Sequence, residues 1–187
     1  MTILRVLQDR YSNPVLQTPV PAAEEIEQAY QAMMRVPDHA RLKPLRLQIW
    51  QGKGLQRLGS IFARCAQEDN PDVSQHELDR YRGLPLRAPM VAVVTAAIQE
   101  HPKVPEIEQV ISTGCSAFAM ILALNDLGYG CMWRTGAFAY NPKVKSVLGI
   151  DSSDHIVGFI YIGTKGQTRV KKAVAPDFSE RVSFIDE

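Results

Sequence analysis

Three short segments of the chain hold the residues whose types and spacing could do chemistry. Arg10 and Ser12 can together hold an anion, because a guanidinium is a forked, permanently charged donor and a hydroxyl adds another. Taken alone, such a pair is more often a surface arginine at a helix end. The candidate residues are Arg10, Tyr11, Ser12, Arg35, His39, Trp133, Arg134 and Thr135.

The sequence lacks the motifs of catalysis by protein groups alone. It has no G-x-S-x-G and no H-E-x-x-H, and its four histidines and three cysteines are not spaced as metal ligands. Cys115 and Cys131 are interpreted as packed thiols and not as redox groups. We therefore expect no metal and assign no catalytic acid or base. If the chain is an enzyme, a cofactor carries the chemistry.

Composition excludes several classes of partner. The 21 basic and 20 acidic residues nearly balance, so we expect no binding to nucleic acid or to a membrane. The amino terminus has no signal-peptide pattern and no apolar run reaches about 20 residues, which predicts a cytoplasmic protein. A chain of 187 residues is expected to form one domain spanning 1–187.

The spacing of apolar residues predicts the elements that must position the candidates. Residues 45–51 alternate like a strand, 90–98 resemble a strand buried on both faces, and 155–163 form a third strand. Residues 131–133 are expected to be a short extended segment. A charged stretch over 69–87 reads as a peripheral helix with loops. Helices are predicted over 3–10, 22–35, 55–67, 104–127 and 141–148.

Two segments predict contacts with another chain. Residues 104–127 are apolar on almost every side, and a helix at a subunit interface or a monomer's core helix would explain this. Residues 182–185 could add a strand to a neighbouring sheet. Strands separated by helices indicate an α/β sandwich, but G-x-G-x-x-G and P-loop motifs are absent, which argues against a Rossmann or P-loop protein.

The three candidate segments together resemble the FMN-dependent nitroreductase family, in its shortest, YdjA-type branch. The matching segments are 10–12, 35–39 with Lys43 and Pro44, and 130–136. Supporting matches are 101–105 and 156–164, so the order and spacing agree over nearly the whole chain. The resemblance implies an α+β three-layer sandwich, with a central, mostly antiparallel sheet flanked by helices, in an intertwined homodimer.

The resemblance also implies the roles of the candidate residues. Arg10, Tyr11 and Ser12 would hold the FMN phosphate and ribityl chain, and Arg35 and His39 would approach the same flavin from the other subunit. Trp133, Arg134 and Thr135 would complete the pocket. NADH or NADPH would give a hydride to flavin N5, and a nitroaromatic, a quinone or a similar small acceptor would then take its place in a ping-pong cycle.

Some points stay open at this level. The resemblance associates Ala123, Leu124, Asn125, Asp126, Leu127 and Gly128 with NAD(P)H, although these residues look like an ordinary helix end. Many nitroreductases have a basic residue near the flavin pyrimidine where this chain has Pro14. The alternatives are a non-catalytic flavin-binding or storage module, a structural α/β interaction domain, or a related reaction such as dehalogenation, cyclic-peptide oxidation or flavin breakdown.

Overall fold

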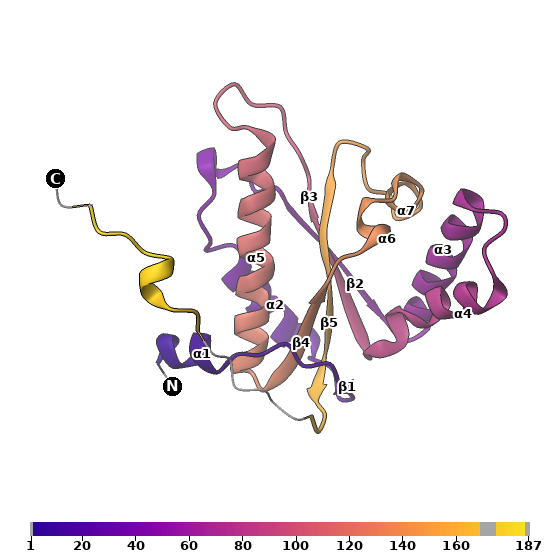
Figure 1. Cartoon of the computed structure of the whole chain (residues 1–187), viewed down its shortest axis with the longest axis horizontal. Coiled ribbons are helices and arrows are strands. Elements are labelled where there is room, and N and C mark those ends of the chain that lie inside the picture. The colour runs from indigo at the N-terminus through magenta and orange to yellow at the C-terminus, as the bar shows by residue number, and fades with distance from the viewer. Residues whose placement is uncertain (1, 169–174, 186–187) are drawn as a thin grey trace.

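A five-stranded antiparallel sheet is the centre of the molecule in the computed structural model, which describes residues 2–168 and 175–185 (Figure 1). Strands β2, β3 and β5 pair in this order, and β5 also pairs with β4 and, near its end, with the short β1. The strands are β1 Leu16–Gln17, β2 Leu45–Gln51, β3 Met90–Ala96, β4 Tyr129–Arg134 and β5 His155–Lys165. The predicted strands at 45–51, 90–98, 131–133 and 155–163 are confirmed, with the 45–51 strand matching at both ends and the others agreeing within two residues at their ends.

Helices cover both faces of the sheet and make three layers (Figure 1). One face carries α2 and α5, and the other carries α3, α4, α6 and α7. The helices are α1 Ile3–Asp9, α2 Ala23–Met33, α3 Lys53–Asp69, α4 Gln75–Gly83, α5 Glu106–Asp126, α6 Ala137–Tyr140 and α7 Pro142–Val147. Single 3-10 turns lie at His39–Arg41, Pro85–Arg87 and Phe178–Glu180.

Strand β3 shows why both faces of the sheet are covered. Every residue of β3 is buried, and successive side chains point to opposite faces. Met90, Ala92 and Val94 pack with α2 and α5, whereas Val91 and Val93 pack with α3. The prediction of a strand buried on both faces is therefore confirmed.

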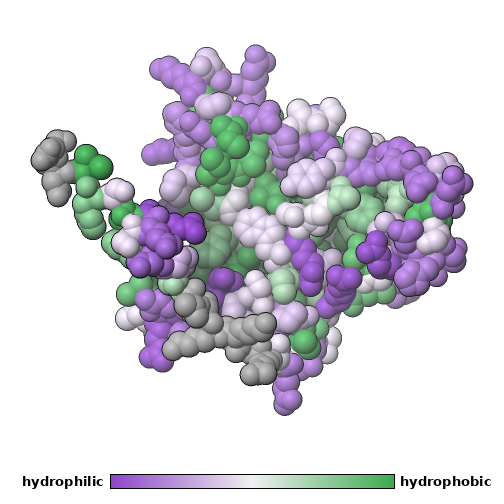
Figure 2. Space-filling model, in the orientation of Figure 1, coloured by the Kyte–Doolittle hydropathy of each residue, from purple (hydrophilic) through white to green (hydrophobic). Residues whose placement is uncertain are grey.

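Helix α5 buries polar residues and exposes apolar ones. Gln109, Ser112, Thr113 and Ser116 are buried, and each makes a hydrogen bond through its side chain. By length and composition alone α5 could cross a membrane, but its buried side packs against α2 and the sheet. Figure 2 shows hydrophobic surface over this helix. The exposed apolar residues of α5 are Ile107, Ile111 and Phe118.

The stretch 69–87 contributes more to the core than its charge suggested. Leu78 of α4 is 4% exposed, and Tyr81 and Leu84 pack on the cluster beneath α3. Helices α3 and α4 approach closely at Gly59, where an added Cβ would lie 2.1 Å from the carbonyl oxygen of Arg82. Residues 182–185, predicted to add a strand to a neighbouring sheet, form no strand within the chain and are exposed.

Candidate functional site

A cavity of about 740 Å³ opens between the ends of β4 and β5 and the helices α3, α4 and α6. We call it the β4 cavity. It contains one complete segment of the sequence prediction, Trp133, Arg134 and Thr135. Its other lining residues are Phe62, Ala66, Asp69, Arg80, Tyr81, Leu84, Arg87, Gly136, Ala137, Phe138, Asn141, Phe159 and Tyr161.

The guanidinium of Arg134 is held in the β4 cavity with unused hydrogen-bonding capacity. Arg134 pairs with Phe159 in the β4–β5 ladder, and its Cζ lies 5.7 Å from the centre of the Tyr161 ring. Its Nε is buried and has no hydrogen-bond partner among the described residues. A buried charged donor without a partner is costly, so Nε is free to donate to an acceptor that enters the cavity, whether a water or a ligand atom.

The aromatic walls of the β4 cavity are packed against one another. Phe62 stacks on Phe138 with ring centres 4.5 Å apart, and its edge meets Phe159 at 5.4 Å. Tyr81 meets Phe138 edge to face at 5.1 Å. Offset and edge-to-face contacts of this kind are favourable and limit ring motion. The cavity therefore offers rigid apolar surface to a planar ligand.

The charge of the β4 cavity is positive. Arg80, Arg87 and Arg134 line it, and among its described lining residues Asp69 is the one carboxylate. Asp69 is already engaged, because the Nζ of Lys143 lies 2.6 Å from its Oδ1 and the amide of Asn141 donates to Oδ2. These hydrogen bonds lower the pKa of Asp69, Lys143 having the larger effect.

Tyr161 adds a hydroxyl donor to the same wall. Burial raises the pKa of Tyr161, and the positive charges of Arg134 and Arg87 oppose this increase without reversing it. The phenol therefore stays protonated at neutral pH and can donate a hydrogen bond into the cavity.

The side chains of Trp133 and Arg134 point to opposite faces of the sheet, as those of neighbouring residues on a strand do. The indole of Trp133 packs with the α2 and α5 cluster, and its Nε1 donates to the carbonyl oxygen of Val157 at 3.3 Å. Gly158 makes room for it, because an added Cβ there would lie 2.1 Å from Nε1. Thr135 is exposed at the mouth of the cavity.

Arg10, Tyr11 and Ser12 lie at the other end of β4. Arg10 caps the carboxyl end of α1, with its Cζ 6.0 Å from the centre of the Phe118 ring on α5. The next residue after this segment, Asn13, donates its backbone N–H to the carbonyl oxygen of Cys131 at 3.0 Å. A strand rises about 3.3 Å per residue, so Cys131 and Arg134 are separated by roughly 10 Å along β4.

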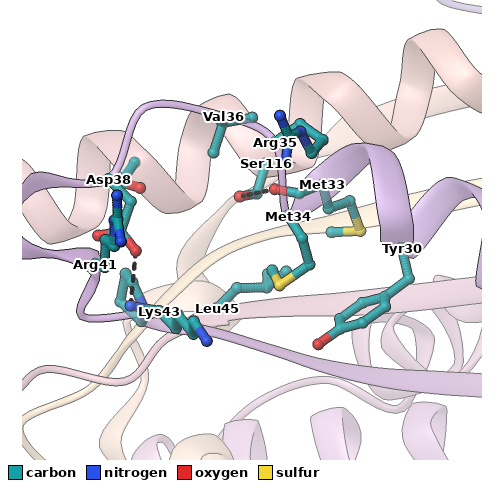
Figure 3. A pocket seen from close by; sticks show the side chains of 12 residues that line it. Tyr30, Met33, Met34, Arg35, Val36, Asp38, Arg41, Lys43, Leu45 and Ser116 are labelled. Carbon is teal, nitrogen blue, oxygen red and sulfur yellow. Dashed lines mark hydrogen bonds between the residues drawn. The ribbon is translucent and has the colours of Figure 1, made fainter.

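Arg35 lines a second cavity, of about 670 Å³, on the α5 side of the sheet (Figure 3). We call it the α2 cavity. The loop that follows Arg35 is strained, because Ala40, Arg41 and Lys43 all have positive φ. Its lining residues are Tyr30, Met33, Met34, Arg35, Val36, Asp38, Arg41, Lys43, Pro44, Leu45, Ser112 and Ser116.

Two hydroxyls of α5 fix the loop that carries Arg35 and His39. Ser116 donates to the carbonyl oxygen of Met33 at 3.0 Å, as Figure 3 shows, and Ser112 donates to that of Pro37 at 2.9 Å. His39 is exposed, and its Nδ1 lies 2.6 Å from Oε2 of Glu108. The segment is thus anchored to α5 on both sides of the loop.

Within one chain, the predicted residues lie in three places. Residues 133–135 line the β4 cavity, 10–12 lie at the start of β4, and Arg35 and His39 lie on the α5 side of the sheet. The helix end 123–128 lines neither large cavity. Leu124 is fully buried, Gly128 ends the helix with φ of 95°, and Asn125 accepts a hydrogen bond from Lys165.

Several residues of the two cavities were missed by the sequence reasoning. Arg80 and Arg87 belong to the charged stretch 69–87, which was predicted to be peripheral, but both line the β4 cavity. The clustering of arginines in this stretch was the one sequence signal that could have pointed to them. Ser112 and Ser116 are four residues apart on a largely apolar helix and so lie on one side of it. This spacing could have predicted a polar stripe, which in the structure donates hydrogen bonds to the segment 33–37. The packing interpretation holds for Cys131, whose pKa burial raises to about 12, but it is wrong within one chain for Cys115, which is exposed.

Comparison with known proteins shows which family this chain resembles. The sequence profile described as "Nitroreductase family" matches residues 8–164. The Escherichia coli (strain K12) protein named "Putative NAD(P)H nitroreductase YdjA" is 35% identical over 185 residues, which cover 99% of this chain and 100% of that protein.

Solved structures agree on the fold. A nitroreductase-like family protein from Bacillus cereus superposes with a TM-score of 0.84 at 20% identity, covering 100% of this chain and 97% of that one. A nitroreductase with bound FMN from Bacteroides fragilis superposes with a TM-score of 0.73 at 15% identity, covering 100% of both chains. With a profile match over most of its length and a relative at 35% identity, the chain belongs to the nitroreductase family.

Proposed function

We propose that this chain is an FMN-dependent oxidoreductase that uses NADH or NADPH to reduce nitroaromatic, quinone or similar small acceptors. The observation that carries the proposal is the β4 cavity. Residues 133–135 line it together with a set of packed aromatic rings, and the Nε of Arg134 has no hydrogen-bond partner among the described residues. Relatives support the cofactor, because the Bacteroides fragilis neighbour is described with bound FMN.

The residues present fit FMN at two points along β4. Arg10 and Ser12, at the start of the strand, are suited to the phosphate, since a guanidinium and a hydroxyl are both phosphate donors. The flat aromatic walls and Arg134, at the far end of the strand, suit a planar ring with polar edges. The cofactor would therefore lie along β4, with its ring toward the β4 cavity.

A second copy of the chain completes the proposed site. Arg35 and His39 lie on the α5 side, away from the β4 cavity of the same chain. The exposed apolar residues Ile107, Ile111 and Phe118 of α5 form the kind of patch that marks a protein interface. The family resemblance assigns Arg35 and His39 to the flavin of the partner chain, and a homodimer through α5 is proposed on that ground together with this exposed patch.

When bound, FMN would accept a hydride at N5 from the nicotinamide and pass electrons to an acceptor that later occupies the same place. The chain's own residues bind and orient the reactants. Packed rings around the cavity keep water from one side of it, and Tyr161 and Arg134 present donors to an electron-rich edge. No side chain is assigned as a catalytic acid or base.

The test is to purify the protein, record its visible spectrum and add NADH or NADPH without oxygen. We expect flavin absorption that bleaches on addition and returns with a quinone or a nitroaromatic compound. A protein that stays yellow with reduced nicotinamide would instead be a flavin-storage module. A colourless protein that cannot be reconstituted with FMN would remove the proposal.

A further inference from the structure

The β4 cavity carries more positive charge than the proposed cofactor requires. In the proposed arrangement the phosphate of FMN lies at Arg10 and Ser12, at the far end of β4. Arg80 and Arg87 nevertheless line the cavity together with Arg134. Within residues 2–168 and 175–185, no carboxylate forms an ion pair with any of these three arginines.

The neighbouring arginine on the same helix behaves differently. Arg82 lies between Arg80 and Arg87 in the sequence, and its Nη1 is 2.6 Å from Oδ1 of Asp79. It does not line the cavity. The Cζ of Arg80 instead lies 5.0 Å from the centre of the Tyr81 ring, so its guanidinium is supported on an aromatic face at the cavity wall. Arg82 is thus neutralised by Asp79, whereas Arg80 and Arg87, which are also exposed, line the cavity without an ion-pair partner among the described residues.

The positive charges and the aromatic walls face the same space. Phe62, Phe138 and Phe159 supply packed rings, and Tyr161 supplies a hydroxyl donor that feels the positive charges of Arg134 and Arg87. A ligand that satisfies both features has a flat ring and a negatively charged substituent. Guanidinium groups match carboxylates well, because two parallel N–H donors meet two oxygens.

We propose that the acceptors preferred by this chain are aromatic acids, whose ring enters the β4 cavity beside the flavin ring and whose carboxylate is bound by Arg80 and Arg87. This inference rests on the proposed function, because it names the acceptor class of that same site. It predicts that an acidic acceptor is favoured over a neutral one of equal size. The preference weakens as the ionic strength rises, because salt screens charges near the surface.

The experiment compares 4-nitrobenzoate with 4-nitrobenzamide, which has nearly the same shape without the charge. Steady-state kcat/KM is measured for both with NADH or NADPH and the FMN-loaded protein. We expect the ratio of the two values to fall about tenfold in the Arg80→Gln, Arg87→Gln double variant, which corresponds to the loss of one charge-assisted contact. Arg82→Gln is the matched control, and its ratio should equal that of the unmodified protein.

A binding measurement separates this inference from the proposed function. Calorimetric titration with benzoate and with benzamide needs no turnover. We expect the unmodified protein to prefer benzoate and the double variant to lose the preference. If the protein proves unable to oxidise NADH or NADPH, the proposed function fails and the titration still decides the inference. An equal ratio and an equal benzoate preference in the double variant would overturn the inference, as would an equal loss in Arg82→Gln.

Discussion

The Nδ1 atom of His39 lies 2.6 Å from Oε2 of Glu108, so the first turn of α5 contacts the imidazole that the family resemblance assigns to flavin binding. A second His–Glu pair also involves the first turn of α5, because Nε2 of His155 is 2.6 Å from Oε1 of Glu106. Both pairs are about half exposed, and exposed ion pairs contribute only about 0–1 kcal/mol to stability. We therefore expect the first pair to act by orienting His39.

Replacement of Glu108 by Ala is expected to weaken FMN binding with little loss of stability. Without the carboxylate, the imidazole of His39 is free to rotate and its second nitrogen is no longer directed. Glu108→Gln should restore part of the affinity, because the amide oxygen still accepts from Nδ1–H. FMN affinity is measured by fluorescence titration, with Glu106→Ala as the control. An equal effect of both alanine variants would show that general charge near α5 is responsible.

Arg10→Ala tests the proposed phosphate contact directly. Removing one partner of a buried charge pair costs on the order of 2–4 kcal/mol, and the same loss is expected in FMN affinity. Arg5→Ala is the matched control, because Arg5 lies on the same helix and pairs with Asp9 at the surface. Affinity for riboflavin, which lacks the phosphate, should change little in Arg10→Ala. Unchanged FMN affinity in that variant would refute the assignment.

Gly158→Ala should disturb the proposed site through the position of Trp133. The new Cβ would lie 2.1 Å from Nε1 of the indole, so the ring must move and its bond to Val157 must break. Overpacking of this kind costs about 1–3 kcal/mol, which urea unfolding measures. FMN affinity should fall as well. Gly83→Ala, where an added Cβ meets no atom within 4 Å, should keep both properties.

Local patterns in the sequence were sufficient for the sheet, and for a physical reason. The Val and Ala run over 90–98 has no polar face, so it could only be a strand covered on both sides, and β3 is buried throughout. The alternation at 45–51 likewise became β2. By contrast, β1 is two residues long and exists because β5 is beside it, a long-range pairing that local periodicity does not reveal.

The candidate site was only partly predictable, because its parts are far apart in the sequence. Residues 133–135 were found through a family resemblance, but the direction of the Arg134 side chain depends on its register with Phe159 in β5. Arg80 and Arg87 looked like a solvated charged stretch, since nothing local shows that α4 packs on α3 at Gly59 and turns these residues toward the cavity. Their role follows from tertiary packing.

Acid should weaken the attachment of α2 to β4 at Glu25. The backbone N–H of Ala22 and the hydroxyl of Tyr129 both donate to Glu25, at 2.8 and 2.7 Å, and lower its pKa. The unfolded chain therefore binds more protons than the folded one between the lowered pKa and the ordinary value of 4.5, and stability is lost as the pH falls through this interval.

Glu25→Gln measures this effect by urea unfolding at several pH values. The variant should be less stable than the unmodified protein at neutral pH, and the difference should shrink as the pH falls below the ordinary value of 4.5 and Glu25 of the unmodified protein becomes protonated. Glu24→Gln, one residue away in the same turn, is the control. A difference that does not depend on pH would show that the lost hydrogen bonds act without the charge.

The exposed apolar residues of α5 predict that the protein forms a dimer through this helix. Ile107 and Ile111 are 60% and 57% exposed in the single chain, one helical turn apart, and Phe118 continues the same side of the helix. A carboxylate placed on a face that a second chain covers loses its hydration without gaining a partner, so Ile111→Glu should raise the dimer dissociation constant by at least about tenfold. Light scattering after size exclusion measures this directly.

The same substitution also tests whether the proposed site needs two chains. If Arg35 and His39 reach the flavin of the partner, FMN affinity in Ile111→Glu should fall in parallel with the dimer fraction and recover at high protein concentration. Val147→Glu, at an exposed apolar residue of α7, should leave both the dimer and the affinity intact. Full FMN affinity in a monomeric Ile111→Glu protein would mean that residues 10–12 and 133–135 of one chain suffice, and that Arg35 and His39 act elsewhere.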